Sequence, residues 1–179
     1  MRQRNERRLD RDALWEYALR AISGRAHSIS EIRDKLRRRA ARLEDVPDLL
    51  ARLKSYGYLD DRQFAETFAA ARLENHGFGR ARVLRDLQVR RIAPKVAEHA
   101  VQEAFRETDE VQLIESFLAR KYRRVSLGEF LADPKNLAAA YRKLRLAGFS
   151  SGNTLRVLKR HAREPEVLDG LEEAEDQAE

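Results

Sequence analysis

Apolar residues recur every three to four positions through most of the chain, a spacing that places them on one face of an α-helix. Residues 32–36 and 83–87 show this spacing in the same register, with Ile32 matching Val83 and Leu36 matching Leu87. No stretch alternates between apolar and polar residues with the period of two that is typical of a half-buried β-strand. The pattern predicts an all-α protein.

Glycine, proline and helix-capping residues divide this pattern into roughly nine helices. Residues 53–58 and 144–149 both contain Leu, Gly and an aromatic residue in the same register, and each Gly marks a helix end. Ser28 and Glu31 have the spacing of a capping box. The predicted helices begin near residues 10, 28, 45, 60, 79, 94, 108, 133 and 151, and the seventh extends from 108 to 125.

The helices fall into three groups, and such repetition is typical of helical repeat proteins. The sequence therefore predicts an elongated tandem array of three three-helix repeats, at residues 10–59, 60–107 and 108–163. Residues 1–9 form a basic N-terminal arm, and residues 164–179 form an acidic tail that we expect to be disordered. Repeats of this kind leave broad surfaces, which suit the binding of another macromolecule.

The cysteine content and the N-terminal residues indicate in which cell compartment we expect the protein. The chain has no cysteine, which excludes disulfides and Cys-based zinc sites and fits a reducing compartment. Residues 1–8 are rich in basic residues, but no apolar run follows them. We therefore expect neither a signal peptide nor a membrane span, and a cytoplasmic location.

Charge is distributed unevenly along the chain. Residues 164–179 contain eight of the 30 acidic residues and no Lys or Arg, so the rest has 36 basic residues against 22 acidic ones, an excess of 14. Such an excess of positive charge in residues 1–163 favours a polyanionic partner, such as nucleic acid or a protein wrapped around nucleic acid. Arg outnumbers Lys by 29 to 7. Codon bias explains much of this ratio, although the planar guanidinium also suits phosphate recognition.

The sequence offers little for catalysis. The four histidines lie far apart, and none has a metal-ligand spacing, so each fits a surface or helix-end position. Asp60 and Asp61 fit helix caps better than metal ligands. Residues 77–80, Gly-Phe-Gly-Arg, lack the strand and the Lys-Ser/Thr of a phosphate-binding loop and fit a tight turn. We expect no enzyme activity, no metal site and no cofactor.

The candidate binding residues are basic side chains that a helical wheel places away from the apolar face, or that end a helix. Any one of them also fits a solvated helix surface, and only their collective excess favours a role in binding. The candidates are Arg82, Arg85, Lys121, Arg123, Arg124, Arg142, Arg145, Arg156 and Arg160.

A more specific pattern occupies the middle of the chain. It comprises residues 57–65 (Gly-Tyr-Leu-Asp-Asp-Arg-Gln-Phe-Ala), 71–72 (Ala-Arg) and 77–87 (Gly-Phe-Gly-Arg-Ala-Arg-Val-Leu-Arg-Asp-Leu). This pattern resembles the central signature of the RecX family of recombination regulators, and the resemblance extends over about residues 14–162. Within it we expect structural roles for Gly57, Tyr58, Phe64, Gly77, Gly79 and Leu87.

Two details of this segment lead to further expectations. Tyr58 and Phe64 flank the junction of the first two groups, so we expect both rings to pack there as core. Residues 88–92 read Gln-Val-Arg-Arg-Ile, where members of the family often have a Lys-Gly-Ile ending. The missing Gly removes an easy left-handed cap, so the end of this helix is not determined by the sequence.

The resemblance implies an all-α fold of three-helix repeats and a role in DNA repair and the SOS response. It also implies binding to the RecA recombinase and its nucleoprotein filament, with inhibition of recombination and ATPase activity by blocked filament growth or by disassembly. The expected partners are this filament and single-stranded or double-stranded DNA, bound without sequence specificity. We expect a monomer that binds no membrane.

Two other functions stay open at this point. Short basic helices after Gly turns also describe a helix-turn-helix protein that binds DNA without a recombinase. The basic residues are spread over several helices, however, which favours contact with a backbone or a filament over readout by one recognition helix. The second alternative is an adaptor whose partner is another protein, with no DNA involved.

Overall fold

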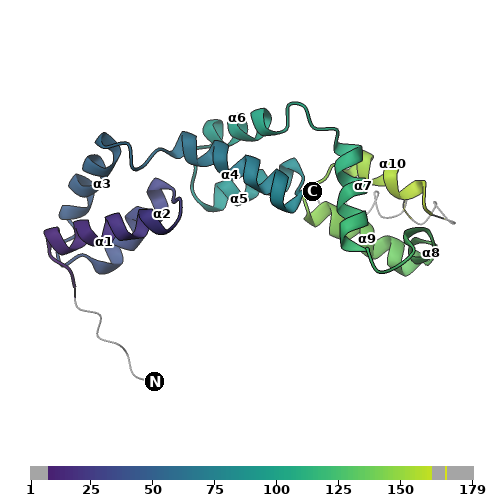
Figure 1. Ribbon diagram of the computed structural model, residues 1–179, viewed down its shortest axis with the longest axis horizontal. Coiled ribbons are helices and arrows are strands. Elements are labelled where there is room, and N and C mark those ends of the chain that lie inside the picture. Colours follow the sequence, from purple (N-terminus) through teal and green to yellow (C-terminus); the bar gives the residue numbers. More distant parts are fainter. Residues whose placement is uncertain (1–7, 163–167, 169–179) are drawn as a thin grey trace, which may run out of the picture. The chain divides into compact units, whose positions relative to one another are not determined.

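The computed structural model describes residues 8–162 and Leu168 (Figure 1). Within these residues it contains ten α-helices and no strand, apart from an isolated bridge between Leu9 and Ala40. The predicted all-α class is therefore confirmed. The helices are α1 (Arg11–Gly24), α2 (Ile29–Arg39), α3 (Asp45–Ser55), α4 (Asp61–His76), α5 (Arg80–Val89), α6 (Pro94–Ala104), α7 (Glu110–Lys121), α8 (Leu127–Leu131), α9 (Pro134–Leu146) and α10 (Ser151–Lys159).

Side-chain caps begin several of these helices. Ser28 Oγ accepts a hydrogen bond from the Glu31 amide at 3.1 Å, and Glu31 accepts one from the Ser28 amide at 3.2 Å, so the predicted capping box of α2 is confirmed. Asp60 caps α4 by accepting from the Arg62 amide at 2.8 Å. Asp61 accepts from the Ile29 amide at 2.8 Å, which stabilises the start of α2. Asp60 and Asp61 thus each accept a hydrogen bond from a backbone amide at the start of a helix, which agrees with the prediction that they are caps and not metal ligands.

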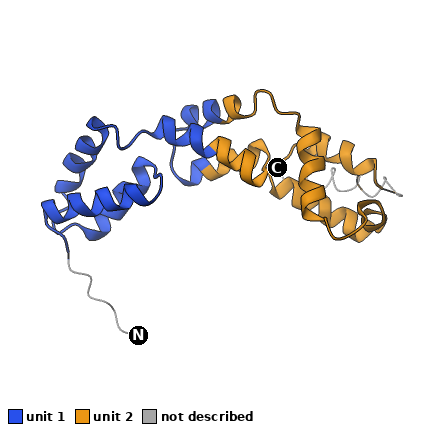
Figure 2. Ribbon diagram, viewed as in Figure 1, with its two compact units in different colours: residues 1–68, 87–100 blue, residues 69–86, 101–179 orange. Residues whose placement is uncertain are grey.

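The chain forms two compact units, which Figure 2 distinguishes by colour. Unit 1 comprises residues 1–68 and 87–100, and unit 2 comprises residues 69–86 and 101–179. The boundary passes through α4, α5 and α6, the helices predicted as the middle repeat. The proposed division into three repeats therefore stays a prediction.

Unit 1 is built on the apolar faces of α1, α2 and α3. Each fully buried Leu or Ile contributes about 1.5 to 3 kcal/mol relative to an exposed one, and this cluster contains several. Its buried residues are Leu14, Ala18, Ile32, Leu36, Ala40, Val46, Leu49, Leu50, Leu53 and Leu59.

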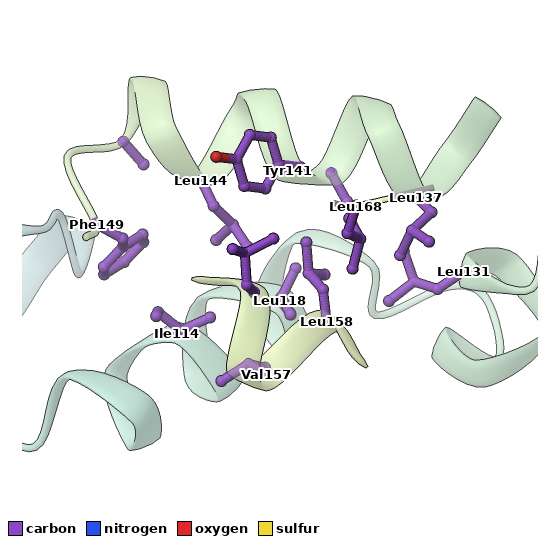
Figure 3. Close-up of a cluster of buried hydrophobic side chains, with 13 residues drawn as sticks. Ile114, Leu118, Leu131, Leu137, Tyr141, Leu144, Phe149, Val157, Leu158 and Leu168 are labelled. Atoms are coloured by element: carbon purple, nitrogen blue, oxygen red, sulfur yellow. The ribbon is translucent and has the colours of Figure 1, made fainter. Parts of the chain in front are cut away.

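Unit 2 has a larger core, in which α7, α9 and α10 bury their apolar faces together (Figure 3). Tyr141 on α9 is 1% exposed, and its hydroxyl lies 3.1 Å from Ser151 Oγ, so the buried polar group is satisfied. Leu168 also packs in this cluster with no exposed surface. It is the only described residue of the predicted acidic tail, and the rest of that tail lies outside the described residues.

Helix α8 was not predicted from the sequence. The helix expected over residues 108–125 ends at Lys121, and a turn leads to α8. Five residues are too few to display a helical period, although Leu131 is fully buried in the core of unit 2. The last helix is also shorter than expected, ending at Lys159 instead of residue 163.

The predicted glycine helix ends are confirmed, and another end of the same type carries no glycine. Gly57 follows α3 with φ of 72°, and Gly148 follows α9 with φ of 92°. After α5 the equivalent position is Arg91, with φ of 57°. The hydrogen bond from the Ile92 amide to the Leu87 carbonyl at 3.2 Å closes this end as a Schellman motif. The backbone therefore keeps the left-handed cap even where the residue is not Gly.

Candidate partner-binding surface

All nine candidate basic residues belong to unit 2. They lie on α5, at the end of α7 and in the turn after it, on α9, and on or directly after α10. Four of them make side-chain hydrogen bonds or ion pairs to other described residues of the unit, and five do not. This difference separates candidates that stabilise the fold from those that are available to a partner.

Arg82 and Arg85, on α5, are both engaged within unit 2. The Arg82 guanidinium lies 3.1 Å from Asp86 and 5.5 Å from the ring of Phe78, and its side chain is 43% exposed. Arg85 is exposed but donates to the Leu146 carbonyl, the last residue of α9, at 3.3 Å. The wheel placed both side chains outward, yet Arg82 is only half exposed because Asp86 and Phe78 hold it.

Arg145 and Arg160 are engaged as well. Arg145 donates to the Phe149 carbonyl at 2.6 Å, across the turn that ends α9. Arg160 forms an ion pair with Glu115 on α7 at 2.6 Å. Exposed pairs of this kind contribute about 1 kcal/mol or less. The charge of Arg160 is nevertheless partly neutralised by Glu115 before a partner binds.

The other five candidates are exposed, and none has a hydrogen bond or ion pair from its side chain to another described residue. Lys121 is the last residue of α7. The prediction that Arg123 and Arg124 end that helix is wrong, because they lie in the turn beyond it. Arg142 on α9 is exposed and lies about 100° around the helix from the buried Tyr141, which directly precedes it. Arg156 on α10 follows the buried Leu155 in the same way.

A contact around Tyr122 brings the end of α7 close to α9. The Tyr122 ring lies 4.8 Å from the Phe130 ring of α8 and 5.4 Å from the ammonium group of Lys143. Lys143 is exposed and neighbours Arg142 in the sequence. Lys143 was not predicted from the sequence, because only packing places its charge near the turn after α7.

Glu110 fixes the start of α10, and with it the helix that carries Arg156. Its carboxylate accepts from the Ser150 amide at 2.9 Å, the Ser150 hydroxyl at 2.5 Å and the Asn153 side chain at 2.6 Å. Burial raises the pKa of Glu110, but these hydrogen bonds and the charge of Arg80 outweigh it and hold the pKa below its usual value.

Other arginines stabilise helix C-termini and were not identified as such from the sequence. Arg80 donates to the Phe105 carbonyl, just after α6, at 2.7 Å. Arg120 on α7 donates to the carbonyl of His76, the last residue of α4. A cation at a helix C-terminus satisfies a free carbonyl and interacts favourably with the helix dipole. Part of the arginine content is thus structural.

Gly79 of the central segment packs against the backbone of another turn. The Gly79 amide donates to the Ala147 carbonyl at 2.9 Å, and a Cβ added at Gly79 would lie 2.2 Å from the Gly148 carbonyl oxygen. The Gly-Phe-Gly sequence therefore belongs to a tight turn, as predicted, and it holds the start of α5 against the end of α9.

The two aromatic residues of the central segment differ in their burial. Phe64 is 8% exposed, which confirms its predicted place in the core. Tyr58 is 53% exposed, so the prediction that its ring packs in the core is wrong. Local sequence places Tyr58 directly after a helix-ending Gly, but no element covers the ring within the described part of unit 1.

The described residues show no group of three or more His, Asp or Glu side chains placed to hold a metal ion. His27 is buried, and its Nδ1 donates to the Arg25 carbonyl at 2.8 Å. None of the described helices is long and apolar enough to cross a membrane.

Known proteins resemble this chain over most of its length. Residues 60–101 match the family model described as RecX, second three-helix domain. The regulatory protein RecX of Trichlorobacter lovleyi is 30% identical over 133 residues, which cover 74% of this chain and 80% of the relative. That of Deinococcus radiodurans is 32% identical over 139 residues, covering 78% of this chain and 63% of the relative.

A solved structure has a similar fold. The crystal structure of RecX from Lactobacillus salivarius superimposes with a TM-score of 0.62 at 19% identity, covering 84% of this chain and 96% of that one. The sequence relationship to the Trichlorobacter protein, together with the matching family model, establishes that this chain belongs to the RecX family of regulatory proteins.

Proposed function

We propose that this protein binds the RecA recombinase and its nucleoprotein filament and inhibits the recombination and ATPase activities of that filament. The observation that carries the proposal is the sequence relationship, over most of the chain, to proteins named regulatory protein RecX. Inhibition would proceed by blocked filament growth or by disassembly. The protein would act by binding and not by catalysis.

The basic surface of unit 2 supports contact with the DNA-bearing filament. Lys121, Arg123, Arg124, Arg142 and Arg156 are exposed and have no side-chain partner among the described residues. Cations that neutralise phosphates release counterions, so their contribution to affinity falls as salt rises. The spread of these residues over a turn and three helices favours contact with the nucleic-acid backbone over base readout.

The direct test is the recombinase ATPase rate on single-stranded DNA, measured with increasing amounts of this protein. We expect the rate to fall at amounts well below one protein per recombinase, since one bound molecule at a filament end or groove affects many subunits. An unchanged rate at equimolar protein would contradict the proposal. Binding to recombinase alone, DNA alone and the filament would separate this function from recombinase-independent DNA binding.

A charge-reversal pair would test the basic surface. Arg142→Glu with Arg156→Glu should weaken filament binding and lower its salt slope by about one unit for each lost phosphate contact. Arg38→Glu with Lys95→Glu changes the net charge by the same amount at exposed positions of unit 1 and serves as the control. Equal losses in both variants would show that net charge, and not this surface, determines the affinity.

A further inference from the structure

Unit 1 carries a cluster of three aromatic residues in which Trp15 packs partly against the core, whereas Tyr56 and Tyr58 are exposed. Trp15 comes from α1, Tyr56 directly follows α3, and Tyr58 follows the helix-ending Gly57. The Trp15 and Tyr56 ring centroids are 6.0 Å apart at an interplanar angle of 66°, and those of Tyr56 and Tyr58 are 6.0 Å apart at 65°. We call Trp15, Arg52, Tyr56 and Tyr58 the aromatic surface.

Folding of unit 1 does not explain the two tyrosine rings. Tyr56 is 57% exposed and Tyr58 is 53% exposed, so much of their apolar area stays in water and stabilises little. Neither hydroxyl has a hydrogen-bond partner among the described residues. Large exposed aromatic side chains that lie together are typical of a binding surface.

Arg52 adds a cation to the cluster. Its guanidinium carbon lies 4.1 Å from the Trp15 ring centroid and 5.5 Å from that of Tyr56. Within the described part of unit 1 its side chain makes no ion pair, so its charge is not neutralised by a carboxylate. Lys54, one turn from Tyr58, is also exposed. The surface thus combines aromatic faces with positive charge.

We propose that the aromatic surface is a stacking site for the unpaired bases of single-stranded nucleic acid. The edge-to-face contacts leave Tyr56 57% and Tyr58 53% exposed, so ring surface is accessible to a flat ligand. Bases stack on such rings without sequence preference, while cations beside the rings contact the phosphates. The site is distinct from the basic surface of unit 2, which offers charge without exposed aromatic rings.

A nucleic acid fits this surface better than a protein segment does. The chain outside its acidic tail has an excess of 14 basic residues, which attracts a polyanion. The inference rests on the proposed function for the source of the ligand, because a regulator of a filament on single-stranded DNA meets unpaired bases. The base-stacking contact itself needs no recombinase, so it can be measured alone.

The single tryptophan of the chain provides a direct probe, because Trp15 lies in the proposed site. The full-length protein is titrated with a 16-nucleotide oligothymidine, an abasic oligomer of the same length and charge, and a 16-base-pair duplex. We expect oligothymidine to quench or shift Trp15 fluorescence. The abasic oligomer and the duplex should leave it nearly unchanged, because they present no unpaired base. Equal fluorescence changes with all three ligands would overturn the proposal.

Matched variants separate stacking from other effects. Tyr56→Leu with Tyr58→Leu removes both aromatic faces but retains apolar bulk, and should weaken oligothymidine binding by roughly 5- to 160-fold for each ring that stacks a base. Tyr56→Phe with Tyr58→Phe keeps the faces and should bind within about twofold of the original protein. Both pairs are exposed, so the melting temperature should hardly change, and Val89→Ser, at a residue 79% exposed, is the control.

The remaining outcomes are informative about the partner. Unchanged oligothymidine affinity in the leucine pair would overturn the proposal. Loss of binding to DNA-free recombinase, with oligothymidine binding intact, would show that the surface contacts protein and would also overturn it. If the original protein binds oligothymidine through these rings but never affects the recombinase, the proposed function fails and the stacking site stands.

Discussion

Helix α3 of unit 1 and helix α9 of unit 2 end with the same backbone pattern, yet the aromatic residue that follows is exposed in one and buried in the other. The Tyr58 amide donates to the Leu53 carbonyl at 3.0 Å, and the Phe149 amide donates to the Leu144 carbonyl at 3.2 Å. Tyr58 is 53% exposed, whereas Phe149 is fully buried. The two ends therefore share a Schellman motif but not a role.

The surroundings of the two glycines explain the difference. A Cβ added at Gly57 would meet no atom within 4 Å, whereas one added at Gly148 would lie 2.2 Å from the Arg82 amide nitrogen. The turn after α9 is thus packed against the start of α5, and Phe149 enters the core with it. The turn after α3 is open, so Tyr58 remains at the surface, where it can contact a ligand.

The strongest test of this comparison replaces the two aromatic residues. Phe149→Ala should lower the free energy of unfolding of unit 2 by about 3 to 5 kcal/mol, because it leaves a cavity in the core. Tyr58→Ala should change that of unit 1 by less than about 0.5 kcal/mol. Urea unfolding followed by circular dichroism measures both. Similar losses in the two variants would contradict the assignment of different roles.

The glycines provide the second test. Gly57→Ala should cost about 1 to 2 kcal/mol, the penalty of a left-handed conformation in open space. Gly148→Ala should cost that amount plus about 1 to 3 kcal/mol for the overlap with the backbone of Arg82. Thermal unfolding of each variant gives the difference. If Gly148→Ala is no worse than Gly57→Ala, the turn after α9 is less tightly packed than described.

Arg91 extends the comparison to a helix end with no glycine. Its φ of 57° is unfavourable for a side chain, although the Arg91 guanidinium pairs with Asp34 at 3.0 Å. Arg91→Gly removes a strain of about 1 to 2 kcal/mol and an exposed ion pair worth about 1 kcal/mol or less. We expect a net stabilisation of about 0 to 2 kcal/mol in urea unfolding. Arg91→Ala keeps the strain without the ion pair, so it should be destabilised.

The smallest expected difference between the units is their response to pH. Burial lowers the pKa of His27 more than its hydrogen bond to the Arg25 carbonyl raises it, Arg25 and Lys35 lower it further, and Glu31 raises it. The unfolded state then binds the proton more tightly, so the contribution of His27 to the stability of unit 1 is complete above about pH 6.5 and is lost as pH falls below it.

Glu110 gives unit 2 a different pH window. Its pKa is lowered in the folded state, so its contribution is complete above its usual pKa and is lost as pH falls through the folded value. Melting temperatures measured from pH 7.5 to 3.5 should therefore show the His27 effect first. His27→Gln should remove the change near pH 6, and Glu110→Gln the change at lower pH. A profile unaffected by either substitution would contradict these assignments.

The sequence by itself determined the features that depend on neighbouring residues. The helices, the capping box at Ser28 and the left-handed ends at Gly57 and Gly148 all follow from local spacing and backbone preference. The family resemblance carried by residues 57–87 was equally readable from the chain. The short helix α8 was not, because five residues cannot display a helical period.

Only the tertiary structure decided which side chains are buried, paired or available. In the structure Arg82 forms an ion pair with Asp86, whereas Arg142 and Arg156 are exposed and unpaired among the described residues. A helical wheel places all three away from the apolar face. The tertiary structure also brought Trp15 of α1 beside Tyr56 at the end of α3. A helical period specifies one buried face, but what covers the other positions depends on segments distant in the chain. The aromatic surface therefore could not be predicted from any local pattern.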